Sequence, residues 1–129
     1  MTSASKKPKV LVVDDDPLYL DAYSLKFEKA GFEVIRAEDG EECLEAVKRD
    51  KPSVIVLDIL MPKMGGLEAL NILKNDPETK RIPVVISSAL DEKTDIEKGL
   101  ALGAERYIVK VEMTPTEIVE EVKKCCPKL

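Results

Sequence analysis

Short apolar runs and longer segments with helical spacing alternate along this chain. The first run, KVLVV at 9–13, is continuous and β-branched, which is typical of a strand buried on both faces. Apolar residues then recur at helical spacing, and Gly31 follows where a helix often ends in a left-handed residue. The recurring residues are Tyr19, Tyr23, Phe27 and Ala30. This pattern predicts a buried strand followed by a helix.

The same alternation continues to the last residues of the chain. It predicts further strands at 32–37, 53–58, 82–87 and 105–110. It predicts further helices at 40–50, 67–75, 92–103 and 114–126. Pro52 ends one of these helices, while Thr114 and Pro115 suit the cap and first turn of the last one. Five strands that are apolar on both faces, each followed by a helix, predict an α/β fold with a doubly wound, five-stranded parallel sheet.

Length and composition restrict the classes of protein that this chain can be. With 129 residues, 44% of them hydrophobic and 35% charged, the chain suits one compact domain, expected at 9–127 after a flexible tail at 1–8. A net charge of -5 argues against binding to nucleic acid. No apolar run approaches the roughly 20 residues of a membrane span, and the first residues do not resemble a signal peptide, so we expect a cytoplasmic protein.

Histidine and cysteine usage excludes further kinds of chemistry. The chain has no histidine, which removes histidine-based triads and most zinc sites. Its three cysteines have no CxxC spacing, and we expect all of them to be buried or half-buried thiols.

Polar residues stand where the predicted strands end. In a doubly wound sheet these carboxyl ends meet at one edge, where ligands bind. Carboxylates crowded there repel one another unless a cation lies among them, and Mg²⁺ is the hard cation that oxygen ligands favour. Carboxylate, hydroxyl, lysine and Mg²⁺ together are what phosphoryl transfer requires. The residues concerned are Asp14, Asp15, Asp16, Asp58, Ser87, Ser88 and Lys110.

Simpler interpretations exist for several of these residues taken alone. Asp16 precedes Pro17 and suits the cap of the first helix. Ser88 could cap the helix that follows it, and Lys110 could be an ordinary surface lysine. Their joint position beside the carboxylates favours the site.

Five strings of the sequence, in this order and at these separations, resemble the receiver domain of two-component response regulators. The resemblance runs from about Lys9 to the last helix and implies the flavodoxin-like (βα)5 receiver fold. The strings are VLVVDDDP, GFEVIRAEDGEECLEAV, VIVLDILMPKMGG, IPVVISSAL and GAERYIVK.

The resemblance implies a role for each site residue. Asp58 would be the phosphoacceptor. Mg²⁺ would be held by Asp58, by Asp15 directly and Asp14 through water, and by the backbone carbonyl of Leu60. Ser88 would be the switch hydroxyl, Tyr107 the aromatic switch and Lys110 the lysine that pairs with the phosphoryl group. Ser87 matches no functional position and is expected to pack within its strand.

Two positions depart from the family pattern. Receivers usually follow the lysine with a proline in a cis peptide, but Val111 stands here. Because a cis bond before another residue costs ~3 kcal/mol, we expect a trans peptide and an altered loop. Gly65 replaces a frequent Asp, which predicts a weaker cap for the third helix.

The resemblance implies a phosphorylated signalling switch and not an enzyme, apart from transfer onto its own aspartate and autodephosphorylation. Its donor would be a histidine kinase or a phosphotransfer protein, and a downstream protein would bind the face formed by the fourth helix, fifth strand and fifth helix. We expect a monomer or weak dimer. Leu60 and Leu90, two residues beyond Asp58 and Ser88, are expected to shield the phosphoryl group from water and so slow its loss.

Three other interpretations remain at this point. The chain could be a receiver excised from a larger response regulator. A haloacid-dehalogenase-type phosphatase would need a second acid two residues after its nucleophile, where Leu60 stands. A flavodoxin-like mononucleotide binder would need a phosphate-binding loop where DDDP would repel phosphate.

Overall fold

The sheet is parallel and five-stranded, with helices on both of its faces. The structure, a computed structural model, describes residues 7–126. The strands are β1 (Lys9–Val13), β2 (Glu33–Ala37), β3 (Val54–Leu57), β4 (Val84–Ser88) and β5 (Arg106–Val109). The helices are α1 (Pro17–Lys29), α2 (Gly40–Asp50), α3 (Gly66–Lys74), α4 (Lys93–Ala101) and α5 (Pro115–Cys125), with a short 3-10 helix at Lys110–Glu112. The predicted α/β fold is therefore confirmed.

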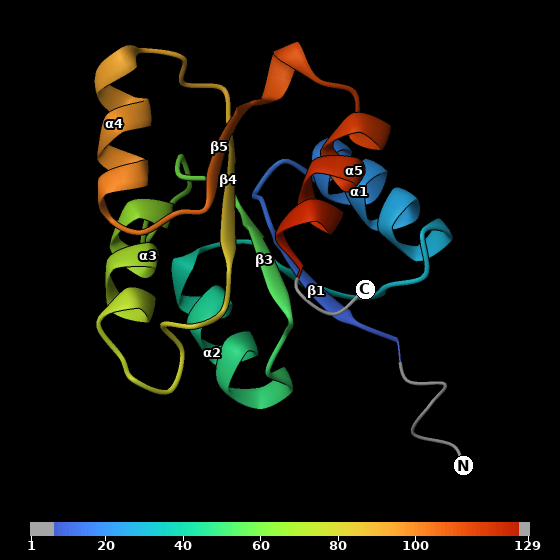
Figure 1. Cartoon of the computed structure of the whole chain (residues 1–129), viewed down its shortest axis with the longest axis horizontal. Helices are drawn as coiled ribbons and strands as arrows, with labels where there is room; N and C mark the ends of the chain where they lie inside the picture. The colour runs from blue at the N-terminus through green and yellow to red at the C-terminus, as the bar shows by residue number, and fades with distance from the viewer. Residues whose placement is uncertain (1–6, 127–129) are drawn as a thin grey trace.

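The strand order is β2-β1-β3-β4-β5, and every neighbouring pair is parallel. From β1, an inner strand, the chain moves outward to β2, then crosses over β1 to β3 and continues to β5. Helices α1 and α5 cover one face, and α2, α3 and α4 cover the other (Figure 1). The point where the winding reverses lies between β1 and β3, which are hydrogen-bonded neighbours.

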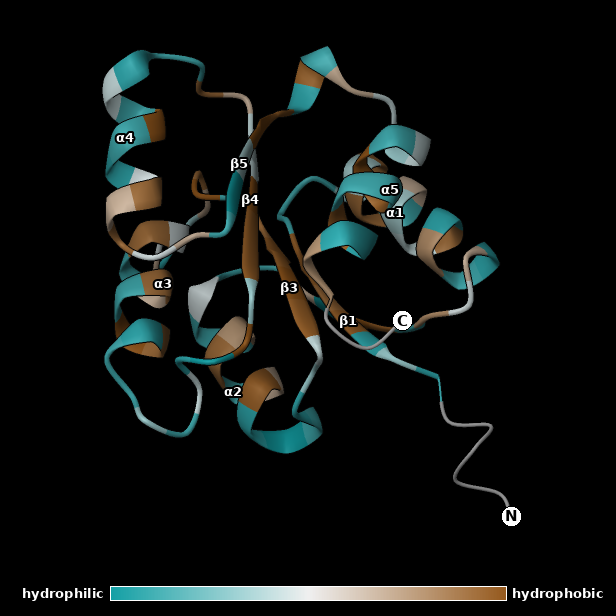
Figure 2. Cartoon of the chain, in the orientation of Figure 1, coloured by the Kyte–Doolittle hydropathy of each residue, from teal (hydrophilic) through white to brown (hydrophobic). Residues whose placement is uncertain are grey.

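Alternate residues of the central strands enter two separate hydrophobic cores. In β1, Leu11 and Val13 pack on the α2 and α3 side, while Val10 and Val12 pack on the α1 and α5 side. Side chains of a strand point to opposite faces in turn, so a strand covered on both sides must be apolar at every position. This is why β1 after Lys9 and all of β3 are apolar, as the hydropathy colouring shows for β3 (Figure 2).

The edge strands do not follow the prediction that the strands are apolar on both faces. Glu33 and Arg36 of β2 are exposed, and so is Arg106 of β5. β2 and β5 are the outer strands, so helices cover them less completely than the three central strands. The correction concerns only these edges.

Helix ends follow from local sequence chemistry. The side chain of Asp16 accepts a hydrogen bond from the Leu18 amide, which confirms it as the α1 cap. Thr114 caps α5 and forms a capping box with Glu117. Gly31 has a φ of +98°, a conformation that other residues rarely adopt, and so turns the chain after α1.

Some element boundaries differ from those predicted. Ala30 was predicted to lie on the buried side of α1, but it is exposed and forms the C-cap of that helix. α2, in contrast, has the predicted bounds Gly40–Asp50, and Lys51 caps it in a left-handed conformation just before Pro52. As expected, Gly65 gives α3 no side-chain cap. In the described residues, no helix has the length and apolar character needed to cross a membrane.

The cysteines lie where the sequence predicted. Cys43 and Cys126 are buried and Cys125 is half-buried. All three are free thiols. The predicted tail at 1–8 falls mostly outside the described residues, so its boundary stays a prediction.

Candidate functional site

Two buried aspartates lie side by side at the carboxyl edge of the central strands. Asp14 follows β1 and is 1% exposed, and Asp58 follows β3 and is 4% exposed. Their backbones continue the ladder, because the Asp14 amide donates to the Ala37 carbonyl and the Asp58 amide to the Val13 carbonyl. The pairing of β1 with β3 thus places both carboxylates at the point where the winding reverses.

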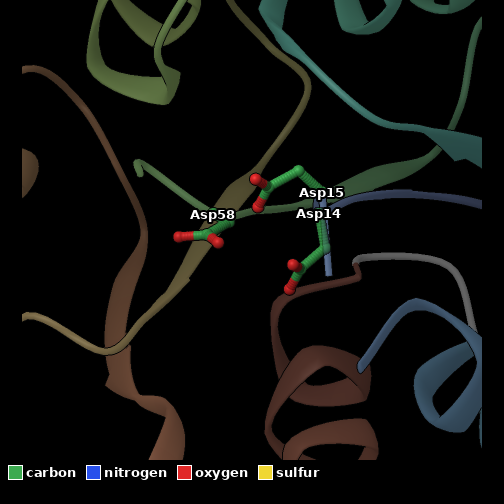
Figure 3. Close-up of side chains that lie close together, drawn as sticks. All are labelled: Asp14, Asp15 and Asp58. Carbon is green, nitrogen blue, oxygen red and sulfur yellow. The ribbon is translucent and has the colours of Figure 1, made fainter. Parts of the chain in front are cut away.

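Asp15 completes a group of three carboxylates (Figure 3). One oxygen from each of Asp14, Asp15 and Asp58 lies within 4.8 Å of the others. Asp15 is exposed, unlike the other two, and so opens the group to solvent. Three carboxylate oxygens at this spacing could hold a divalent cation that keeps some of its waters.

Lys110 supplies a positive charge to the same group. Its Nζ lies 2.7 Å from Asp14 Oδ2 and 3.0 Å from Asp58 Oδ2, and its side chain is 6% exposed. Burial alone would lower the Lys110 pKa, but the hydrogen bonds and charges of the two carboxylates outweigh it, so the pKa is raised. Lys110 therefore stays charged within the site.

For Asp14, the effect of burial outweighs that of the neighbouring hydrogen bonds and charges. Burial raises its pKa above the ordinary value, and the hydrogen bonds from Lys110 and from the Asp16 amide only partly offset this. A nearby cation therefore stabilises the ionised form of this buried carboxylate.

The two serines at the end of β4 point to opposite faces of the sheet. Ser88 is fully buried, and its Oγ accepts a hydrogen bond of 3.1 Å from the Leu90 amide. Ser87, which the sequence indicated only as strand packing, shares a buried hydrogen bond of 3.0 Å with the Tyr23 hydroxyl on the α1 side. Successive side chains of a strand point to opposite faces, so the two adjacent serines contact different groups.

Tyr107 is half-buried on β5 and reaches toward the same loop. Its hydroxyl donates a hydrogen bond of 2.8 Å to the Leu90 carbonyl. Burial raises the pKa of the phenol, which keeps it a hydrogen-bond donor at neutral pH. Ser88 and Tyr107 are thus both hydrogen-bonded to Leu90.

The loop after β3 lies close to the buried aspartates. The Leu60 amide donates to Asp58 Oδ1 over 3.1 Å, and the Leu60 side chain is 51% exposed. A Cβ atom on Gly66 would lie 2.2 Å from the Asp58 carbonyl oxygen, so only glycine lets α3 begin this close to β3. Leu90 is half-buried on the neighbouring loop.

The peptide bond after Lys110 has the geometry predicted from the missing proline. The Lys110–Val111 peptide is trans, and a 3-10 helix at Lys110–Glu112 replaces the end of the expected strand. Val111 is 78% exposed. Lys110 still reaches both buried aspartates.

One neighbour of Lys110 was not anticipated from the sequence. The ring of Tyr19, on α1, lies under the ammonium with its centroid 4.3 Å from Nζ. Its helical spacing indicated only a core position. The one signal in the sequence was that Tyr19 comes three residues after Asp16, close to the carboxyl edge of the sheet.

The fold and this arrangement of charges agree with the comparison with protein families. Residues 10–123 match the model of the response regulator receiver domain, so the chain belongs to this family. Receiver domains are signalling domains of two-component systems and not conventional enzymes.

Several relatives with known names or structures share this domain. The alkaline phosphatase synthesis transcriptional regulatory protein PhoP of Bacillus subtilis is 37% identical over 89% of this chain and 47% of its own length. Protein PilH of Pseudomonas aeruginosa is 36% identical over 79% of this chain and 84% of PilH. The chain thus spans about half of PhoP but most of PilH.

Solved receiver structures share the fold of this chain. The chemotaxis response regulator CheY4 of Vibrio cholerae has a TM-score of 0.84 and 28% identity, and covers 92% of this chain and 98% of its own. A Francisella response regulator receiver domain has a TM-score of 0.82 and 35% identity, over 91% and 94% of the two chains.

Proposed function

We propose that this chain is a phosphorylated signalling switch in which Asp58 accepts a phosphoryl group. The observation that carries the proposal is the buried Asp58 carboxylate, 3.0 Å from the Lys110 ammonium and grouped with Asp14 and Asp15. An Asp58 carboxylate oxygen would attack phosphorus, forming an acyl phosphate while the donor's leaving group departs with its electron pair. Lys110 would then pair with the new phosphoryl oxygens.

Asp14, Asp15 and Asp58, with the backbone carbonyl of Leu60, would hold Mg²⁺. The donor set fits this ion, because all four ligands are oxygens and the open side at Asp15 leaves room for waters. When bound, the ion would neutralise charge on the carboxylates and on the phosphoryl oxygens.

Ser88 and Tyr107 are proposed to report the phosphorylation. Ser88 would turn its hydroxyl from the Leu90 amide to a phosphoryl oxygen, releasing the loop to which Tyr107 is bonded. The face of α4, β5 and α5 would then bind a downstream protein differently. Amide hydrogen exchange on this face should change when Asp58 is phosphorylated. Unchanged exchange would leave Tyr107 as an ordinary edge-strand tyrosine.

The donor would be a histidine kinase or a phosphotransfer protein. Receiver domains work with such kinases as a class, and the chain itself contains no histidine that could carry the phosphoryl group. A direct test needs no kinase. Incubation with acetyl phosphate and Mg²⁺ should add one phosphoryl group by intact mass, releasing acetate, and Asp58→Asn should abolish it. An adduct that survives this substitution would place the phosphoacceptor elsewhere.

A further inference from the structure

Lys110 touches an aromatic ring as well as the two carboxylates. The Tyr19 ring centroid lies 4.3 Å from Nζ, within the range of a cation–π contact. The Lys110 side chain is 6% exposed, so the contact is shielded from water. Shielded contacts of this type are stronger than those on the surface.

The Tyr19 ring is itself held by packing. Its centroid lies 5.7 Å from that of Tyr23, and the two rings are tilted by 54°. Tyr23 is 1% exposed, and its hydroxyl shares a hydrogen bond of 3.0 Å with Ser87 of β4. Tyr19 therefore packs against Tyr23, which is itself buried and hydrogen-bonded to the sheet.

Lys110 lies just beyond the last residue of β5. Lys110 begins a 3-10 helix of three residues, and the next side chain, Val111, is 78% exposed and so contributes little packing. Asp14 and Asp58 both attract the ammonium. The Tyr19 ring also attracts it without accepting a strong hydrogen bond, so the N–H groups remain available to the carboxylate oxygens.

We propose that Tyr19 is a positioning residue that holds the Lys110 ammonium at Asp58. This inference deepens the proposed function. Its rate measurement depends on that function, and its folding measurement does not. The aromatic ring is the necessary feature, and the hydroxyl of Tyr19 is not. Tyr19→Phe should therefore preserve the contact, and Tyr19→Leu should remove it while leaving a smaller apolar side chain.

A double-mutant cycle with Lys110→Met tests the contact without any phosphoryl donor. Tyr19→Leu should lower the equilibrium constant for folding about 5- to 30-fold more in the wild-type chain than in Lys110→Met. Tyr19→Phe should show no such difference. The ε-methylene protons of Lys110 should also lose a ring-current shift in Tyr19→Leu but keep it in Tyr19→Phe. Equal effects of Tyr19→Leu in both backgrounds would overturn the proposal.

Phosphorylation by acetyl phosphate with Mg²⁺ tests the consequence. Tyr19→Leu should react about 5- to 30-fold more slowly than wild type, and Tyr19→Phe within about twofold. Phe27→Leu is the matched control, because Phe27 is a buried ring of the same helix that packs on Phe32 and not on Lys110. It should lose stability but keep the rate. A Tyr19→Leu rate equal to that of wild type would overturn the positioning role.

The two failures can be told apart. If wild type takes no phosphoryl group on Asp58, the proposed function is wrong, and the folding cycle still measures the contact between Tyr19 and Lys110. If wild type is phosphorylated but the cycle shows no coupling, only the inference about Tyr19 is wrong.

Discussion

Lys110 Nζ lies 2.7 Å from Asp14 Oδ2, although β3 and β4 separate their strands in the sheet. The lysine side chain and the two aspartate side chains meet at the carboxyl edge of the sheet, where the same Nζ also contacts Asp58. One buried cation therefore faces two buried carboxylates. This imbalance of charge governs the stability of the site as well as its chemistry.

Removing the Lys110 charge should destabilise the fold. Lys110→Met leaves Asp14 and Asp58 buried without their cation, and loss of one partner of a buried ion pair costs about 3–5 kcal/mol. We expect a loss near the lower end in urea unfolding at pH 7, because Asp15 opens the group to solvent. The loss should be smaller at pH 5, since the raised pKa of Asp14 lets it take up a proton. Lys93→Met, at an exposed lysine of α4, is the control and should change little.

Magnesium should stabilise the folded chain. The proposed ion would bind the assembled carboxylates and not the unfolded chain, so at ten times its dissociation constant it should add about 1.4 kcal/mol to the free energy of unfolding. Asp15→Asn should weaken this gain, because it removes the charge of the exposed member of the group. A melting temperature that is the same with and without millimolar Mg²⁺ in wild type would contradict the metal site.

Leucine side chains beside the site should slow the loss of the phosphoryl group. Water must approach phosphorus opposite the Asp58 oxygen, and neither Leu60 nor Leu90 can hydrogen-bond a water there. Leu60→Asn and Leu90→Glu should therefore shorten the lifetime of the phosphorylated chain several-fold, as followed by intact mass. Leu100→Asn, at a leucine of α4 that is 44% exposed, is the control. If the polar variants decay at the wild-type rate, the leucines serve only packing.

Cys43 should make the fold sensitive to alkaline pH. Burial raises the pKa of its thiol from 9.0 to about 12. Below pH 9 the thiol is protonated in both states and has no effect. Above it, the unfolded chain releases this proton first, so stability falls until the folded thiol also ionises near pH 12. Between pH 8 and pH 10, wild type should lose about 1.4 kcal/mol more than Cys43→Ala in urea unfolding. Equal losses would show that the thiol is accessible.

The sequence by itself determined the order of the elements and which residues end the central strands. Continuous apolar runs can be stable only where both faces are covered, so β1 and β3 predicted a parallel sheet with helices on each side. Because parallel strands present their carboxyl ends at one edge, Asp14 and Asp58 were expected together. Local caps, such as Asp16 and Thr114, were also predictable, because they depend only on neighbouring residues.

Only the tertiary structure decided which distant side chains touch. The order of the strands left β2 and β5 at the edges, where exposed charges replace apolar residues. Helical spacing placed Tyr19 and Tyr23 on one side of α1, but the angle and depth at which α1 packs on the sheet brought them to Lys110 and Ser87. Such contacts depend on packing between segments far apart in the chain, and no local pattern of residues encodes their distances.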